Sequence, residues 1–291
     1  MDATGSAVPG AGGARHGVAA RQVLTLFGDY WWGIGAPVPA GAMVAALGDL
    51  GVKEAAARAT LSRLVRTGLL RAERTGRRTA HALTDRATEI VREEADWLES
   101  FGVDEPEWDG QWSVLAFSIP EARRTLRHHA RVRLKWLGFA PLYDGVWISP
   151  LTAAEEALAQ LRALGVGDLT AMRATLHTSP DGPQRAWDLD AVAQHYARFA
   201  ADVRASAPID DPAGALRERS QLMLAWQGVR GVDAGLPARL LPAPWPRVTA
   251  RRLFAERFDR LGPLAEQRIR EHVATIDAAL AERVTARRLA R

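Results

Sequence analysis

Residues 53–84, KEAAARATLSRLVRTGLLRAERTGRRTAHALT, decide the fold of the N-terminal part of this chain. An apolar stripe runs through the first half of the stretch and consists of Ala57, Leu61, Leu64 and Val65. This spacing predicts an amphipathic helix that ends before Gly68. The second half predicts two short strands, LLRAER and TAHALT, joined by a glycine-containing turn at residues 75–78. We therefore expect a helix followed directly by a β-hairpin.

Two further helices are expected upstream of this stretch. One covers residues 18–33, and the next runs from about Ala40 to Leu50 and stops at Gly51. A turn of about three residues then leads into the third helix, which is the helix-turn-helix arrangement. With the hairpin as the wing and an acidic helix over 85–101, residues 18–104 are expected to form a winged helix-turn-helix domain. Residues 1–17, rich in Gly and Ala, predict a flexible tail.

A second order of elements follows the acidic helix. The apolar run WSVLAFSI (112–119) predicts a buried strand. A helix, two short strands around 139–143 and 146–149, a helix with a Thr152–Glu155 capping box and a strand around 171–177 follow it. The order β-α-β-β-α-β predicts a ferredoxin-like domain over residues 105–180. Residues 181–291 have helical spacing, so we expect an α+β protein with a helical C-terminal domain.

Charge is distributed unevenly along the chain. The formal net charge of the whole protein is only +4, but residues 51–80 carry +6, residues 85–109 carry −8 and residues 121–136 carry +5. A polyanion is therefore attracted to particular segments rather than to the whole surface. The chain has no cysteine, which excludes disulfides, thiolate zinc sites and cysteine nucleophiles. No apolar run reaches the roughly 18 residues of a membrane span, so we expect a cytoplasmic protein.

The third helix and the hairpin carry the residues expected to contact double-stranded DNA. If the apolar stripe points inward, Arg58, Ser62 and Arg63 lie on or near the outward side of the helix. Arginine bonds bidentately to guanine, serine contacts bases or phosphates, and arginines on a wing suit phosphate or minor-groove contact. The candidate DNA-binding residues are Arg58, Ser62, Arg63, Arg66, Arg71, Arg74, Arg77 and Arg78.

Two alternatives to this interpretation stay open. Winged helices also serve as protein-interaction modules, and basic residues on a helix often form only a solvated face. For Arg58, a base contact competes with a contact to the DNA backbone and with a salt bridge to Glu54, four residues earlier.

A basic stripe is predicted on the helix of residues 121–137. Arg124, Arg127, Arg131 and Lys135 follow one another at spacings of three, four and four, with His128 and His129 beside them. The stripe fits an anion site, such as one for the phosphates of a coenzyme A ester, or an additional DNA contact. A solvated face paired with acidic residues of 85–109 is the structural alternative.

Motifs for catalysis are not found in the sequence. It contains no GxSxG, phosphate loop or dinucleotide fingerprint, and the seven histidines show no metal-ligand spacing. Ferredoxin-like nucleases place a metal-binding aspartate at the end of the first strand, where this chain has Phe117-Ser118-Ile119-Pro120. We therefore expect no enzyme activity, catalytic residue, metal or cofactor. The alternatives are an enzyme in which the winged helix is an interaction module, and a regulator without a ligand.

Several stretches resemble one known family. They are ARQVLTLFGDYWW (20–32), residues 50–84, the stretch from Trp108 to Pro150 that contains GVWISP, and GLPARLLPAPWPRVTARRLF (235–254). Together they resemble the PaaX-type repressors of phenylacetic acid degradation. The resemblance implies a dimeric transcriptional repressor with a winged helix, a ferredoxin-like middle domain and a helical C-terminal domain. It also implies an acyl-CoA effector, since phenylacetyl-CoA is the inducer known in the family.

The C-terminal motif departs from the family pattern at two places. The chain has Asp233-Ala234-Gly235 where Asp-Pro is frequent, and Arg247 where a glycine commonly follows Trp-Pro. If the motif shapes the effector site, these departures imply an effector other than phenylacetyl-CoA. The candidate effector-binding residues are Arg124, Arg127 and Arg131, for the phosphates, and Trp245, whose role rests on the resemblance.

Overall fold

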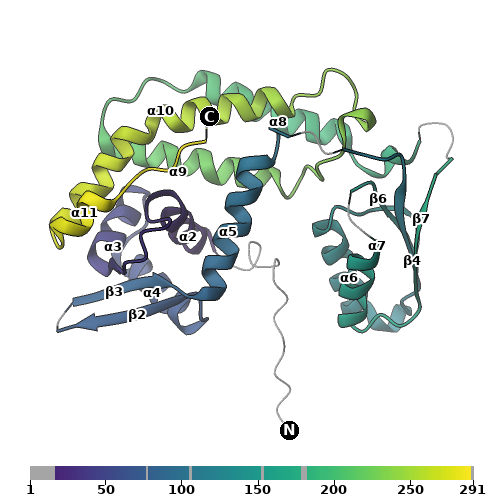
Figure 1. The fold of residues 1–291 in the computed structure, drawn as a ribbon, viewed down its shortest axis with the longest axis horizontal. Helices are drawn as coiled ribbons and strands as arrows, with labels where there is room; N and C mark the ends of the chain where they lie inside the picture. The colour runs from purple at the N-terminus through teal and green to yellow at the C-terminus, as the bar shows by residue number, and fades with distance from the viewer. Residues whose placement is uncertain (1–16, 77, 105–106, 152–153, 178–181, 290–291) are drawn as a thin grey trace, which may run out of the picture. The chain divides into compact units, whose positions relative to one another are not determined.

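The computed structural model describes residues 17–76, 78–104, 107–151, 154–177 and 182–289. The fold is a mixed α+β fold with two antiparallel sheets (Figure 1). The chain divides into two compact units, each built from segments that are separated in the sequence. Unit 1 contains residues 1–101, 200–227 and 249–291, and unit 2 contains residues 102–199 and 228–248. The predicted tail lies outside the described residues except for Gly17, and the predicted three-part division of the chain stays a prediction.

The N-terminal elements of unit 1 follow the predicted order. They are α2 (Val18–Tyr30), β1 (Val38–Pro39), α3 (Ala40–Asp49), α4 (Glu54–Arg66), β2 (Leu70–Thr75), β3 (Arg78–Leu83) and α5 (Asp85–Ser100). The sheet order is β1-β3-β2, with every pair antiparallel. The sequence did not predict β1, because Pro37 and Pro39 were interpreted as breaks. Proline is tolerated here because β1 is an edge strand, where a missing N–H leaves no ladder bond unmade.

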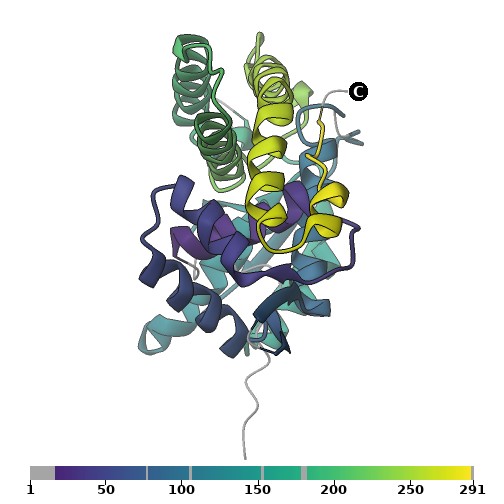
Figure 2. The same cartoon turned by 90° about the vertical axis from the view of Figure 1, so that its left-hand side faces the viewer.

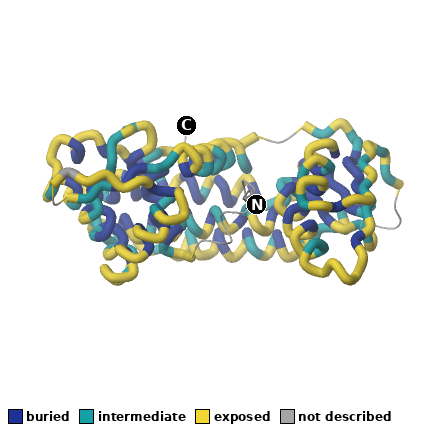
Figure 3. Tube along the Cα trace, turned by 90° about the horizontal axis from the view of Figure 1, so that it is seen from below, coloured by how far each residue is buried: buried dark blue, intermediate teal, exposed yellow. Residues whose placement is uncertain are grey.

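An apolar core is shared by these elements. Val23, Leu26, Leu47 and Leu61 are at most 2% exposed and belong to one cluster. In Figure 3 the buried positions recur along the helices of each unit, as expected for amphipathic helices that present one face to a core. The inward positions predicted for the acidic helix, Val91, Ala95 and Leu98, are also buried.

The C-terminal helices pack on this N-terminal part within unit 1. α9 (Pro212–Val229) and α10 (Arg247–Ala274) lie side by side next to α2 and α3, and α11 (Ala278–Arg283) follows α10 (Figures 1 and 2). Leu280 and Val284 enter the same apolar core. The backbone N–H of Arg287 donates to the carbonyl of Asp29 at 2.8 Å, so the last described segment runs along the end of α2. Two helices were predicted from Val248 onward, and both are present.

A buried arginine of α9 lies against α2 and α10. The side chain of Arg219 is fully buried and donates to the carbonyls of Phe258 and Arg287 at 3.2 and 2.6 Å. Its guanidinium lies 3.6 Å from the centre of the Phe258 ring and 3.7 Å from a carboxylate oxygen of Asp29. Burial raises the pKa of Asp29 to about 6, against the opposing effect of Arg219 and Arg287. Arg219 thus joins three segments that are distant in the sequence.

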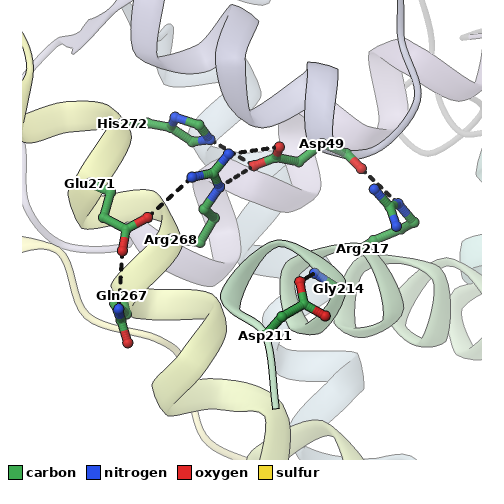
Figure 4. Close-up of polar contacts among 8 residues, drawn as sticks. All are labelled: Asp49, Asp211, Gly214, Arg217, Gln267, Arg268, Glu271 and His272. Carbon is green, nitrogen blue, oxygen red and sulfur yellow. Dashed lines mark hydrogen bonds and ion pairs between the residues drawn. The ribbon is translucent and has the colours of Figure 1, made fainter. Parts of the chain in front are cut away.

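Asp49, at the end of α3, forms a second connection to the C-terminal helices (Figure 4). Its carboxylate accepts two hydrogen bonds from Arg268, at 2.7 and 3.1 Å, and lies 2.7 Å from Nε2 of His272. Its carbonyl accepts a bond of 2.8 Å from Arg217 of α9. Glu271 in turn accepts from Arg268. Because the turn into α4 begins at the next residue, these contacts fix the end of α3 and the start of that turn.

Unit 2 contains the second sheet. Its elements include β4 (Trp112–Phe117), α6 (Arg124–Trp136), β5 (Ala140–Tyr143), β6 (Val146–Ser149), α7 (Ala154–Ala163), β7 (Leu169–Ala174) and most of α8 (Leu189–Ala205). The predicted β-α-β-β-α-β order is present, with a fully antiparallel sheet in the order β5-β6-β4-β7. β7 begins earlier than predicted, and Thr152 of the expected capping box lies outside the described residues.

The turn between β5 and β6 requires a glycine. Gly145 has a φ of +76°, and a Cβ at this position would lie 2.7 Å from the carbonyl oxygen of Phe117. The carbonyl of Gly145 accepts a hydrogen bond from the N–H of Phe117 at 2.9 Å. The Asp144-Gly145 turn, expected from the sequence, therefore closes tightly on the end of β4.

The buried arginine of α9 yields a prediction about stability. Replacing Arg219 by Met should lower the free energy of unfolding by about 3–5 kcal/mol, because Asp29 would lose a partner inside the core. Arg217→Met, two residues earlier on the exposed side of α9, is the matched control and should cost about 1 kcal/mol or less. Urea unfolding at pH 7 measures both. Equal losses in the two variants would show that Arg219 is not a central contact.

The Asp49 contacts yield a prediction about acid stability. Burial raises the pKa of Asp49, but the hydrogen bonds from Arg268 and His272 outweigh burial and hold this pKa below its usual range. A carboxyl whose pKa is depressed by folding adds stability above its unfolded pKa of about 3.9, and loses it as the pH falls through the lower folded value. The stability difference between wild type and Asp49→Asn should therefore be full at pH 5–7 and shrink below about pH 4. Urea unfolding over this pH range tests it, and a difference that is constant down to about pH 2 would contradict it.

Candidate nucleic-acid interface

The helix α4 has one buried face and one exposed face. Ala57, Thr60, Leu61 and Leu64 are at most 4% exposed and fix the orientation of the helix. Lys53 precedes the helix in an extended conformation, and Glu54 occupies its first turn, where a negative charge is favourable. The predicted contact residues of α4 are Arg58, Ser62, Arg63 and Arg66, and all four are exposed. The apolar spacing in the sequence therefore identified the exposed face correctly.

Arg58 forms the intrahelical salt bridge that the sequence left open. Its guanidinium lies 2.8 Å from the carboxylate of Glu54, and both side chains are more than half exposed. An exposed pair of this kind contributes little to stability and is easily exchanged for another anion. Arg63 and Arg66 differ from Arg58, because neither side chain has a hydrogen-bond or ion-pair partner within the part of the chain that the structure describes.

The hairpin adds further arginines to the same unit. Arg71 donates to Glu73 at 3.0 Å and to the carbonyl of Leu83 at 3.2 Å. Arg74 is exposed and, among the described residues, its side chain has no partner. Arg78 donates to the carbonyl of Ile276 at 3.2 Å, a link between the β2–β3 hairpin and the residues between α10 and α11 that the sequence did not indicate. Arg77, predicted at the tip of the wing, lies outside the described residues.

The basic stripe of α6 is interrupted by other contacts. Arg124 and Arg131 are exposed, and each lies near one carboxylate, Glu121 at 3.7 Å and Asp144 at 3.8 Å. Arg127 instead donates to the carbonyl of Ile119 at 2.7 Å, which ties α6 to the end of the preceding strand. The structure thus brings Arg124 and Arg131 to an exposed surface and gives Arg127 a structural contact.

Trp245 lies beside a buried polar network in unit 2 that the sequence did not indicate. Its ring packs edge-on against Tyr196, with the ring centres 6.4 Å apart. The hydroxyl of Tyr196 donates to Asp233 at 2.6 Å, and Arg247 donates to both carboxylate oxygens of Asp233 at 2.9 and 3.1 Å. Burial and the neighbouring carboxylate raise the pKa of Tyr196. The Asp233–Arg247 pair closes the loop of residues 233–247.

A hollow of about 660 Å³ lies at the end of β4. Ser118, Asp144 and Asp168 are among the residues that line it. Asp144 and Asp168 belong to loops other than residues 117–120, where the sequence has no carboxylate. Nevertheless, the described residues include no group of three or more His, Asp or Glu that is suited to hold a metal ion. The described helices also include none with the length and apolar character needed to cross a membrane.

Comparisons with known proteins cover most of the chain. Three family models match in succession: "PaaX-like protein" at residues 19–87, "PaaX protein central Cas2-like domain" at residues 105–186, and "PaaX-like protein C-terminal domain" at residues 187–271. The protein called transcriptional repressor PaaX of Escherichia coli (strain K12) is 28% identical over 260 residues, which is 84% of this chain and 80% of that relative.

A solved structure has the same fold. The uncharacterized protein Rv0674 from Mycobacterium tuberculosis superposes with a TM-score of 0.60 at 21% identity, over 87% of this chain and 96% of that one. The three consecutive family models carry the assignment further than this likeness does, since together they extend from residue 19 to residue 271. The chain belongs to the PaaX family.

Proposed function

We propose that this protein is a DNA-binding transcriptional repressor that contacts duplex DNA through α4 and the β2–β3 hairpin. The observation that carries the proposal is that α4 and the hairpin expose several arginines. The opposite face of α4 is buried in the core, which fixes the orientation of the helix. A rigid helix with a cationic exposed face fits the major groove, and a basic hairpin beside it fits the flanking phosphates. The name of the E. coli relative, a transcriptional repressor, supports the same function.

The proposal includes the finer fold assignments. We interpret α3, α4 and the hairpin as a winged helix-turn-helix and the sheet of unit 2 as a ferredoxin-like domain. The eight residues predicted from the sequence, Arg58, Ser62, Arg63, Arg66, Arg71, Arg74, Arg77 and Arg78, remain the proposed DNA contacts. A cytoplasmic homodimer would read an inverted repeat whose half-sites lie about 10–10.5 base pairs, or a multiple of this, apart.

The repressor is proposed to be released by an acyl-CoA effector bound to unit 2. Arg124 and Arg131 carry long, exposed ion pairs, so a phosphate can replace the carboxylates of Glu121 and Asp144 at low cost. Arg127 and Trp245 stay in the proposed effector site, with Arg127 supporting the start of α6. A ligand releases DNA only if it binds the DNA-free conformation more tightly than the DNA-bound one.

Salt dependence tests the DNA interface. Arg63→Ala combined with Arg74→Ala should weaken binding to the operator and to random duplexes alike, because both side chains are proposed to contact phosphates. The slope of log affinity against log salt should become shallower by about 0.9 for each phosphate that the variant no longer neutralises. Fluorescence anisotropy between about 50 and 200 mM salt measures this slope. The operator fragment is one that the purified protein captures from genomic DNA of its source organism.

A matched double variant controls for net charge. Arg198 and Arg204 are exposed arginines of α8, and replacing both by alanine removes the same charge far from the proposed interface along the sequence. This control should bind DNA with the wild-type slope. Equal slopes for wild type and both double variants would refute the assignment of the interface to α4 and the hairpin.

The effector proposal has its own test. Acyl-CoA should weaken operator binding and the corresponding free acid should not, since only the CoA ester carries the phosphates. Arg124→Glu with Arg131→Glu should abolish this response and leave DNA affinity unchanged; Arg127 is left intact because it holds the carbonyl of Ile119. Titration calorimetry with a panel of acyl-CoAs measures binding. No heat with any acyl-CoA, or loss of DNA binding in the double variant, would overturn the proposed effector site.

A further inference from the structure

The exposed face of α4 has a narrow crest with a mixed composition. At about 100° per residue, Ala55, Ala59, Ser62 and Arg66 project within a sector of about 60°. All four are exposed, and they point directly away from the buried face formed by Ala57, Thr60, Leu61 and Leu64. Residues on this crest approach closest to a groove that receives the helix. Ser62 and Arg66 are the only polar side chains among them.

The other two arginines of α4 lie on its flanks. Arg58 and Arg63 project about 70° to either side of the crest. Arg58 is held to the first turn by Glu54, with Nε at 2.9 Å from the carboxylate oxygen. From the flanks of a helix in the major groove, side chains reach the walls of the groove, where the phosphates lie. Neither flank is suited to read the base edges at the floor.

Arg66 is the last residue of α4, but its side chain can still reach the middle of the exposed face. Side chains of an α-helix lean toward its N-terminus, so we expect the guanidinium of Arg66 to reach back toward the turn that carries Ser62. Within the described residues this side chain has no hydrogen-bond or ion-pair partner, so no internal contact must break before it binds a ligand. Ala55 and Ala59 extend little from the helix and allow its axis to come close to the base pairs.

We propose that Arg66 is the arginine of α4 that determines sequence specificity, by donating two hydrogen bonds to N7 and O6 of a guanine in the operator. This inference rests on the proposed function and goes beyond it, because the sequence left a base contact open only for Arg58 and did not consider one for Arg66. Guanine offers two acceptors side by side in the major groove, and the guanidinium of arginine matches them bidentately. Ser62, one turn before Arg66, contacts the same groove, while Arg58 and Arg63 contact phosphates.

An atomic substitution in the DNA tests the proposal. In the operator captured by the protein, each guanine is replaced in turn by 7-deazaguanine, which lacks only the N7 acceptor. One replacement should lower wild-type affinity on the order of tenfold. The same replacement should have no effect on Arg66→Ala, whose affinity for the unmodified operator is already reduced while its affinity for random DNA is nearly unchanged. Arg66→Lys, which donates to one acceptor at a time, should retain part of the preference.

Arg63→Ala and Arg58→Ala are the matched controls on the same helix. Each should lose affinity equally on operator and random DNA, and each should keep the wild-type response to 7-deazaguanine. If instead Arg58→Ala removes that response, or if Arg66→Ala weakens operator and random DNA equally, Arg66 is not the specificity-determining residue although the repressor assignment stands. A protein that binds no duplex DNA even at low salt would overturn the proposed function itself.

Discussion

A fully buried cation, Arg219, ties together distant segments of unit 1. The guanidinium of Arg219 donates to the carbonyls of Phe258 and Arg287 and lies near the carboxylate of Asp29, with no exposure to solvent. A buried charge is tolerated only where partners surround it, so these segments must converge. Asp29 belongs to α2, which precedes α3 and α4, while Phe258 and Arg287 lie near the other end of the chain. The proposed DNA-binding surface therefore rests on both ends of the chain.

This constraint explains why α10 and the residues after it belong to the same unit as α2–α5. Asp49 is held by Arg268 and His272, Arg78 by the carbonyl of Ile276, and Arg283 donates to the carbonyl of Ile34 at 2.5 Å. Every one of these contacts joins an arginine or histidine to the backbone or to a carboxylate on the opposite segment. The last family model ends at residue 271, whereas the contacts of His272, Ile276 and Arg283 lie beyond that residue. The C-terminal segment is thus a structural part of unit 1 rather than an appendage.

In unit 2, a buried pair of an arginine and a carboxylate likewise holds the loop of residues 233–247. Arg247 is buried and paired bidentately with Asp233. It therefore has a structural role, because it also donates to the carbonyl of Leu236 at 3.0 Å and fixes the loop between them. The ring of Trp245 packs edge-on against Tyr196, whose hydroxyl donates to Asp233 of this network.

Local patterns determined the elements of this protein. Apolar spacing, turn glycines and strand lengths predicted α2–α5, the hairpin and the β-α-β-β-α-β order, because these features depend on neighbours a few residues apart. The same spacing also identified the exposed face of α4, although it could not show which arginine already had a partner. β1 was missed because a two-residue edge strand with proline has no periodicity to detect.

The ion pairs between distant residues follow from the tertiary structure alone. No spacing rule pairs Asp29 with Arg219, Asp49 with Arg268 or Asp233 with Arg247. No local pattern shows either that each compact unit combines segments that are far apart in the sequence. The chain has 38 arginines and lysines and 34 aspartates and glutamates, so charge alone allows far too many pairings to choose among. The choice is made by packing: burying the apolar faces of the helices brings a few of these groups out of water, and each must then find a partner.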